Sequence, residues 1–501
     1  MPRVPVRLTS IVATLGPATA DEEVLRPMIP AGMDVARLNF AHGDHASHAA
    51  MLERVRQAAA AEGRFVAVLQ DLAGPKLRLR TPAGGTVDVV PGNRLRLVGD
   101  LPDAAAPAPH PAAQPADASA GPRDVATNFP QMLDDLREGQ PVLFGDGAVR
   151  TRVVERTDGA VVLEADDEGV LAPGMGINLP ETDLTVDLPT AKDWDDLAWA
   201  VEHDVEYVGL SFVRSADEVR RVKAYLVEKG SEAHVIPKIE KPQAVDAIDA
   251  ILAEADAILV ARGDLGVEMD LARVPVIQKD LIRRAAEAGV PVITATQMLQ
   301  SMITEARPTR AEVTDVAGAV FDGSDAVMLS GETAVGRHPV GAVAMMDHII
   351  DVAEDYAERV GRPMSPAGRQ RYVWSERAIV AGAAGIARDL GVRAIVALTH
   401  SGATALLISK QGLGVPIMGV SDSLRTCRRM ALYRGVTPVH HPDLIRHDDL
   451  ALAAEQLACE RKLVAAGDRI LIMCGYLPGR PGGTDTLRVH TVSGSEEGNS
   501  E

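Results

Sequence analysis

Short apolar runs alternate with amphipathic stretches over most of the chain. Eight of the runs have the length and flanking turn residues of buried strands. They lie at residues 10–16, 34–40, 65–72, 206–213, 234–240, 257–264, 290–297 and 325–332. Helical patterns separate them at 44–62, 192–203, 215–229, 241–254, 273–288, 309–321 and 338–359. This alternation predicts a parallel α/β fold, and eight strands favour a closed (β/α)8 barrel over a doubly wound open sheet.

The alternation is interrupted between the third and fourth predicted strands. Residues 75–187 carry short alternating strands with Gly, Asp-Gly and Pro turns, which predicts an inserted small β-barrel lid domain. Within it, the Ala- and Pro-rich segment 101–124 has no periodicity, and we expect a flexible loop. The barrel would then consist of residues 1–74 and 188–361.

A second α/β unit is predicted at residues 362–490. Its strands are "RAIVALT", "PIMGVSD", "VTPVHH", "RILIMCG" and "TLRVHTV". Helical patterns accompany them at 375–389, 402–411, 423–432 and 447–465. The acidic and polar residues 491–501 are expected to form a disordered tail.

Composition narrows the class of protein. A chain of 501 residues is too long for one core, and its net charge of −19 argues against a nucleic-acid partner. The small and odd number of cysteines, three, is typical of a reduced, cytoplasmic protein without a disulfide framework. None of them has a metal-ligand spacing. No apolar run is long enough for a signal peptide or a membrane span, so no membrane partner is expected.

Polar and charged residues gather at the carboxyl ends of the predicted barrel strands, where (β/α)8 barrels carry their chemistry. In chain order these residues are Arg37, Asn39, Asp71, Ser211, Lys238, Glu240, Gly263, Asp264 and Thr296. A single Lys-x-Glu is usually a structural ion pair, and "RGDLG" is a common turn sequence. Independent surface decoration would not choose the same end of five different strands, so the set predicts one site.

Glu240 and Asp264 would offer two hard oxygen ligands from adjacent strands. Two carboxylates, completed by substrate oxygens and water, suit Mg²⁺ or Mn²⁺. Lys238 would add a cation beside the metal, which predicts a highly anionic ligand. Gly263 leaves the backbone accessible, so amides near it could bind a carboxylate or phosphate.

Seven segments resemble the signature segments of the pyruvate kinase family, in the same order and across nearly the whole chain. They are "SIVATLGPAT", "GMDVARLNFAHGDH", "IPKIEKPQAV", "ILVARGDLGVE", "VITATQMLQSM", "PTRAEVTDVAGAVFDGSDAVMLSGETA" and "ALYRGVTPV". The resemblance implies that phosphoenolpyruvate and ADP give pyruvate and ATP, the last step of glycolysis. It also implies a homotetramer.

The resemblance also implies roles for single residues. Lys238 matches the lysine that stabilises the transferring phosphoryl group, Arg37 a phosphate contact, and Glu240 and Asp264 the divalent-metal ligands. Phosphoenolpyruvate would be held by Gly263, Asp264 and Thr296, together with Arg37, Lys238 and Ser211. A water near Thr296 would protonate the enolate. The nucleotide side would involve Arg78, His42 and Lys192, although the segment "LPTAKDW" around Lys192 is shorter than usual.

One position departs from relatives that need potassium. Asn39 and Asp71 match the monovalent-cation ligands, but the accompanying serine and threonine are replaced by Ala41 and Leu72. Lys76 stands where those relatives carry a glutamate. A lysine ammonium is a fixed monovalent cation, so the resemblance implies that K⁺ is not required.

The segment "LTHSGATA" resembles the family's effector loop, with Thr399, Ser401, Gly402 and Thr404 as candidate contacts. The sequence that follows resembles the class activated by AMP or a sugar phosphate; a simple capped turn is the alternative. Two other functions stay open: a Mg²⁺-dependent barrel lyase or aldolase, and a non-catalytic binding scaffold. The second fits poorly with the complete set of site residues.

Overall fold

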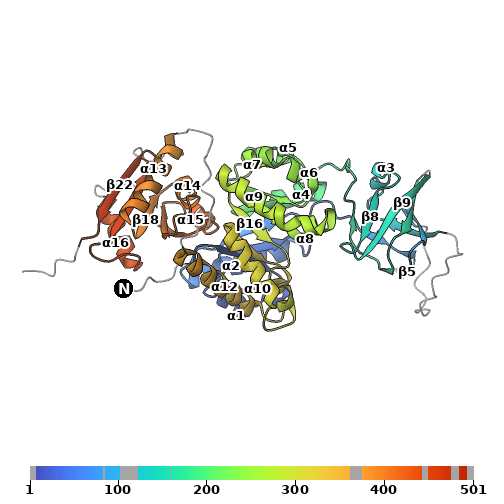
Figure 1. Cartoon of the computed structure of the whole chain (residues 1–501), viewed down its shortest axis with the longest axis horizontal. Helices are drawn as coiled ribbons and strands as arrows, with labels where there is room; N and C mark the ends of the chain where they lie inside the picture. The colour runs from blue at the N-terminus through green and yellow to red at the C-terminus, as the bar shows by residue number, and fades with distance from the viewer. Residues whose placement is uncertain are drawn as a thin grey trace, which may run out of the picture.

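The computed structural model describes residues 7–82, 85–101, 122–157, 159–360, 375–442, 450–475 and 484–493. Three domains lie in a row, with a barrel in the centre, a β-rich insert at one end and an α/β domain at the other (Figure 1). Most of the predicted loop 101–124 and of the predicted tail 491–501 lies outside the described residues.

The central domain is a closed barrel of eight parallel strands, so the open sheet is excluded. The strands are β1 (Ser10–Leu15), β2 (Val35–Asn39), β3 (Ala67–Asp71), β13 (Tyr207–Leu210), β14 (His234–Ile239), β15 (Ile258–Ala261), β16 (Val292–Ala295) and β17 (Ala326–Leu329). All eight fall inside the predicted ranges. Closure comes from β1, which pairs with both β2 and β17.

Helices surround the barrel and bury their apolar faces on its outer side. They are α1 (Glu22–Met28), α2 (His45–Ala61), α4 (Ala191–Glu202), α5 (Ala216–Glu228), α6 (Pro242–Asp246), α7 (Ile248–Glu254), α8 (Arg262–Glu268), α9 (Val274–Ala288), α10 (Arg310–Asp322), α11 (Gly331–Ala334) and α12 (Pro339–Arg359). Short 3₁₀ turns are η1 (Pro17–Thr19), η3 (Leu271–Arg273) and η4 (Gln300–Ile303).

Several predicted strands end earlier than the apolar pattern suggested. The strand predicted at 257–264 stops at Ala261, because Arg262 already begins α8. The fourth and seventh stop before Phe212 and Thr296, whose positive φ angles of 58° and 72° are incompatible with an extended strand. The early endings place these residues in turns at the mouth of the barrel.

The insert is an all-β domain apart from the short helix α3 (Met132–Asp135). Its strands are β4 (Leu79–Arg80), β5 (Val87–Val89), β6 (Arg94–Val98), β7 (Arg123–Thr127), β8 (Pro141–Phe144), β9 (Val149–Thr157), β10 (Ala160–Ala165), β11 (Gly169–Leu171) and β12 (Ile177–Asn178). Seven form one sheet in the order β12-β8-β9-β10-β6-β7-β4, and β5 pairs with β11. An isolated antiparallel bridge between Arg78 and Gly176 also pairs the residue before β4 with the residue before β12.

The C-terminal domain contains a five-stranded sheet in the order β20-β19-β18-β21-β22, of which β22 alone is antiparallel to its neighbour. Its elements are α13 (Ser375–Leu390), β18 (Ala394–Leu398), α14 (Ala403–Ser409), β19 (Ile417–Ser421), α15 (Leu424–Met430), β20 (Val436–His440), α16 (Leu450–Glu460), β21 (Arg469–Cys474) and β22 (Thr486–Thr491). The domain contacts the amino ends of the barrel strands: Tyr207 Oη donates to Arg429 O (2.7 Å), and Lys410 Nζ lies 2.7 Å from Asp325 Oδ2. No helix in the described ranges has both the length and the apolar character needed to cross a membrane.

Candidate active site

A cavity of about 260 Å³ opens where the carboxyl ends of the barrel strands meet the insert. It collects side chains that are far apart in the sequence. They lie at or just after the ends of β2, β3, β13 and β14, or in the first turn of α8. The predicted site residues that line it are Arg37, Asn39, His42, Asp71, Lys76, Arg78, Ser211, Lys238, Glu240 and Asp264. Barrel closure therefore gathers most of the predicted set in one place.

Lys238 is surrounded by oxygen atoms. Its Nζ lies 2.8 Å from Glu240 Oε1, 2.9 Å from Ser211 Oγ and 3.3 Å from Asp71 Oδ1. Burial opposes the positive charge, but the carboxylates of Asp71 and Glu240 more than offset it and raise the pKa of Lys238. The ammonium group is therefore charged at neutral pH and is fixed near the centre of the cavity.

Arg37 and Asp71 form a second fixed pair beside it. Arg37 Nε donates to Asp71 Oδ2 (2.7 Å), and Arg37 Nη1 donates to Thr14 Oγ1 (2.8 Å). Burial favours the neutral form of Asp71, yet the cations Arg37 and Lys238 outweigh it and lower the pKa of this carboxyl group. Asp71 thus stays ionised and holds both cations in place.

The two predicted metal ligands, Glu240 and Asp264, both line the cavity. Glu240 Oε2 accepts a hydrogen bond from the Phe212 N–H (2.7 Å), which orients the carboxylate. Asp264 has no ion pair with a described residue, and burial followed by repulsion from Glu240 raises its pKa to about 7. Two neighbouring carboxylates with this unrelieved repulsion are a donor set that fits a divalent cation.

Two predicted substrate contacts do not line this cavity. Gly263 and Thr296 lie next to it, where the Gly263 N–H donates to Thr296 Oγ1 at 2.6 Å. Lys192 is also absent from the cavity wall: its Nζ lies 2.5 Å from Asp196 Oδ2 and 3.0 Å from Phe40 O. Thr296 therefore contacts α8, the helix that carries Asp264 into the cavity wall. Lys192 is instead engaged in an ion pair with Asp196.

The predicted monovalent-cation position has most of its oxygen atoms occupied. Asn39 Oδ1 accepts the Ala41 N–H (3.0 Å), and Leu72 O accepts the Ser211 hydroxyl (2.6 Å). Lys76 Nζ donates to Ala41 O at 2.9 Å. Burial and the nearby cations Arg78 and Lys192 lower the pKa of Lys76, whereas Asp71 acts in the opposite direction.

The sequence analysis missed seven polar residues of the cavity wall: Asp146, Asn178 and Thr182 from the insert, and Arg214, Lys241, Gln243 and Glu268 from the barrel. Lys241 Nζ lies 2.8 Å from Glu268 Oε1, and Asn178 Nδ2 lies 3.4 Å from the same oxygen. Glu268 follows Asp264 by four residues in α8, and that spacing could have indicated a shared helix face. Asn178 had no such signal, because its contact depends on how the insert sits on the barrel.

The predicted effector residues lie in the C-terminal domain, between β18 and α14. Thr399 Oγ1 accepts the Gly402 N–H (2.9 Å), and Thr404 Oγ1 pairs with Thr484 Oγ1 (2.6 Å). Gly402 has a φ of 88°, which explains a glycine at this turn. The N–H groups of His400 and Ser401 have no acceptor among the described residues.

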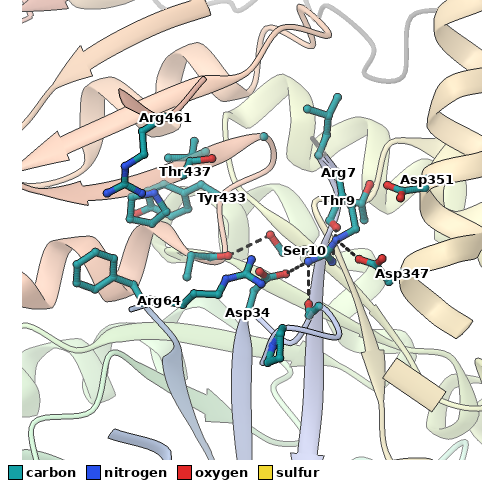
Figure 2. A pocket seen from close by; sticks show the side chains of 18 of the residues that line it. Arg7, Thr9, Ser10, Asp34, Arg64, Asp347, Asp351, Tyr433, Thr437 and Arg461 are labelled. Atoms are coloured by element: carbon teal, nitrogen blue, oxygen red, sulfur yellow. Dashed lines mark hydrogen bonds and ion pairs between the residues drawn. The ribbon is translucent and has the colours of Figure 1, made fainter. Parts of the chain in front are cut away.

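A second cavity, of about 350 Å³, lies at the opposite end of the barrel, between the strand amino ends and the C-terminal domain (Figure 2). Arg7 crosses it, with its Nη2 2.7 Å from Asp34 Oδ2 and its Nε 2.9 Å from Asp347 Oδ1. Ser10 Oγ donates to Ala431 O (3.0 Å) and so connects the two domains. No residue of the predicted catalytic set reaches this cavity.

Comparison with known proteins agrees with this geometry. Residues 6–343 match the family model described as "Pyruvate kinase, barrel domain", and residues 377–490 match "Pyruvate kinase, alpha/beta domain". A pyruvate kinase of Mycobacterium tuberculosis is 38% identical over 492 residues, covering 97% of this chain and 98% of its own. One of Agrobacterium vitis is 37% identical and covers 98% of both. The crystal structure of a pyruvate kinase from Cryptosporidium parvum superposes with a TM-score of 0.86 at 31% identity, covering 97% of this chain and 96% of that one.

Proposed function

This chain belongs to the pyruvate kinase family, and from that premise we propose that it transfers the phosphoryl group of phosphoenolpyruvate to ADP, giving pyruvate and ATP. The observation that carries the proposal is the position of Lys238, a buried cation within 3.3 Å of Asp71, Glu240 and Ser211. The reaction is the last step of glycolysis, and we place it in the cytoplasm, where its substrates are made.

Phosphoryl transfer depends mainly on positioning and on stabilising charge on the transferring oxygens. Lys238 and Arg37 supply two cations that Asp71 already orients, so little reorganisation is needed as charge develops. Ser211 holds Lys238 from the other side. The enolate that remains takes a proton from a water beside the Thr296 hydroxyl.

Glu240 and Asp264 are the residues that would hold Mg²⁺ or Mn²⁺. When bound there, the cation supplies positive charge to anionic substrate oxygens. Asp264 also shares α8 with Gly263, whose N–H donates to Thr296 Oγ1 at 2.6 Å. The insert carries Arg78 and lies over the cavity, so its closure would exclude water that competes with ADP. His42, which lines the cavity, completes the nucleotide side; Lys192 would join it only by leaving its ion pair with Asp196.

We also propose that the enzyme works without K⁺. The support is the hydrogen bond from Lys76 Nζ to Ala41 O and the engagement of Asn39 Oδ1 and Leu72 O by other donors. The test is the rate in K⁺-free and NH₄⁺-free buffer at constant ionic strength. A rise of about tenfold or more on adding K⁺ contradicts the proposal.

Allosteric activation by AMP or a sugar phosphate, in a homotetramer, completes the proposal. It rests on the likeness of residues 398–405 to the family's effector loop, where the N–H groups of His400 and Ser401 have no acceptor among the described residues. Saturation curves for phosphoenolpyruvate, measured with and without these compounds, test it. Curves that no phosphorylated metabolite shifts would reject the effector, and sedimentation analysis tests the tetramer.

The decisive experiment for the main function is ATP formation from phosphoenolpyruvate and ADP with Mg²⁺, coupled to pyruvate detection. A barrel lyase or aldolase would release pyruvate or cleave a carbon chain without making ATP. A binding scaffold would bind phosphoenolpyruvate and form neither product.

A further inference from the structure

The chain leaves β16 through two consecutive residues in the left-handed backbone conformation. Thr296 has a φ of 72° and Gln297 a φ of 55°. This region is unfavourable for any residue with a β-carbon, and more so for β-branched threonine. Such conformations persist where the surrounding structure holds the backbone, and they concentrate at functional sites. The carbonyl groups of this turn therefore need strong hydrogen-bond donors.

The donor is Arg262, the first residue of α8, which lies beside β16 (Figure 1). Its Nε lies 3.1 Å from Ala295 O, and its Nη2 lies 2.7 Å from Thr296 O. Its Nη1 lies 2.6 Å from Asp315 Oδ1 on α10. The planar guanidinium group reaches all three acceptors at once, which a lysine ammonium cannot do.

A second connection runs from the neighbouring residue. The Gly263 N–H donates to Thr296 Oγ1 (2.6 Å), and that hydroxyl donates to Ala295 O (2.6 Å). Arg262 and Gly263 thus tie the end of β16 to the start of α8 through a side chain and a backbone amide. Asp264 is the next residue, so the same two ties set where Thr296 lies relative to the Asp264 carboxylate.

We propose that Arg262 is a positioning residue, which holds Thr296 in its strained conformation and so keeps the Thr296 hydroxyl in register with Asp264. The inference rests on the proposed function. Only 12% of the Arg262 side chain is exposed, and it does not line the catalytic cavity, so it acts through Thr296. Asp315, with 41% of its side chain exposed, anchors the far side of the guanidinium group.

The step that depends on this arrangement is protonation of the enolate. A water O–H bond breaks and a C–H bond forms at the enolate carbon, and the hydroxide left behind takes a proton from solvent. Lys238 and Arg37 lie on other strands and keep their own contacts when Arg262 is changed. Loss of Arg262 should therefore slow proton transfer more than it weakens phosphoenolpyruvate binding.

The experiment is a double-mutant cycle with Arg262→Lys and Thr296→Val. The readouts are kcat and KM for phosphoenolpyruvate, and exchange of the methyl protons of pyruvate in D₂O with Mg²⁺ and inorganic phosphate, followed by NMR. We expect Arg262→Lys to lower kcat and methyl exchange by about tenfold or more while KM changes by less than about threefold. The double variant should resemble Thr296→Val alone, because Arg262 acts through that residue.

Two results would overturn the inference. One is that the effects of the two substitutions on kcat add up in the double variant, and the other is that Arg262→Lys raises KM by the same factor by which it lowers kcat. Arg284→Lys, which changes a surface arginine of α9 paired with Asp280 and Asp249, is the matched control and should behave as wild type. If Arg262→Lys does not fold, Asp315→Asn takes its place and should lower methyl exchange in the same direction with a smaller loss. An unchanged exchange rate in Asp315→Asn, together with an unchanged kcat, would then reject the role.

The two proposals fail in different ways. Wild-type protein that makes no ATP from phosphoenolpyruvate and ADP contradicts the proposed function. Wild-type protein that makes ATP, but whose Arg262 and Thr296 variants are additive, contradicts only the positioning role.

Discussion

The two ends of the central barrel both carry buried charges, but they use them differently. At the amino end, buried cations and carboxylates form direct ion pairs, such as Lys410 with Asp325 at 2.7 Å and Arg434 with Glu354 at 3.3 Å. At the carboxyl end, Lys238 is shared between Asp71 and Glu240, and Asp264 has no ion pair with a described residue. Each end opens a cavity, of about 350 Å³ at the amino end (Figure 2) and about 260 Å³ at the carboxyl end.

The difference separates stability from function. At the amino end, ion pairs across the interface, such as Lys410 with Asp325, give buried charges a partner where the C-terminal domain docks. Incomplete pairing at the carboxyl end is unfavourable for the free protein and becomes favourable when an anion and a metal bind. Cavity size alone therefore does not identify the active site here, and the following changes test the difference between the two ends.

The largest effect is expected for Lys238→Met. The variant should fold and bind phosphoenolpyruvate but lose about 10³-fold in kcat, because a fixed cation at the transferring group is worth about 3–5 kcal/mol. Steady-state kinetics and circular dichroism measure the two properties. Lys229→Met, an exposed lysine that follows α5, serves as the control. Activity within about tenfold of wild type would remove Lys238 from the catalytic set.

Lys410→Met should instead destabilise the protein by about 3–5 kcal/mol, because it leaves Asp325 buried without its cation. The side chains of both partners are at most 3% exposed. Urea unfolding measures the loss, and kcat per folded molecule should not change. The double variant Lys410→Met/Asp325→Asn should recover part of the stability. A Lys410→Met variant of normal stability and reduced kcat would show that charge at the amino end also serves catalysis.

Binding of Mg²⁺ should weaken as the pH falls below about 7. The pKa of Asp264 is raised to about 7 in the metal-free protein, so below that pH a cation has to displace a proton from this carboxyl group. The apparent dissociation constant should rise by up to about tenfold per pH unit. Calorimetric titration between pH 5.5 and 8 measures it. Asp264→Asn should bind the cation more weakly and with little dependence on pH. If Mg²⁺ binding to this variant still depends on pH, the proton that competes with the cation lies on another residue.

The smallest effect is expected for Lys76→Glu in K⁺-free buffer. It removes the ammonium group that donates to Ala41 O and places a carboxylate near Asp71, which should lower kcat by about tenfold or less. Added K⁺ should restore the rate only in part, because Ala41 and Leu72 offer no side-chain oxygen. Full restoration by K⁺ would mean that the monovalent-cation site is complete without those side-chain oxygens. The variant Lys76→Met separates the loss of the lysine ammonium group from the gain of a glutamate carboxylate.

Much of the fold could be predicted because its signal is local. Apolar runs of strand length, separated by helical periodicity, identified all eight barrel strands and the order of the three domains. The ends of the strands were less predictable. The predicted strand 257–264 included "ARGD", but Arg262 already opens α8. The positive φ angles at Phe212 and Thr296 also have no counterpart in the pattern. They follow from contacts with distant segments.

By itself, the sequence determined which residue types stand at the carboxyl ends of the strands, and with them the chemistry of Lys238, Glu240 and Asp264. Only the tertiary structure decided which side chains share a cavity: it brought together Glu268 and Asn178, which come from the barrel and the insert. It also joined Arg262 to the turn that carries Thr296. The physical reason is that hydrophobic periodicity reports the environment of each short segment, whereas these contacts join residues 34 to 90 positions apart whose distance is set by barrel closure and by the seating of the insert.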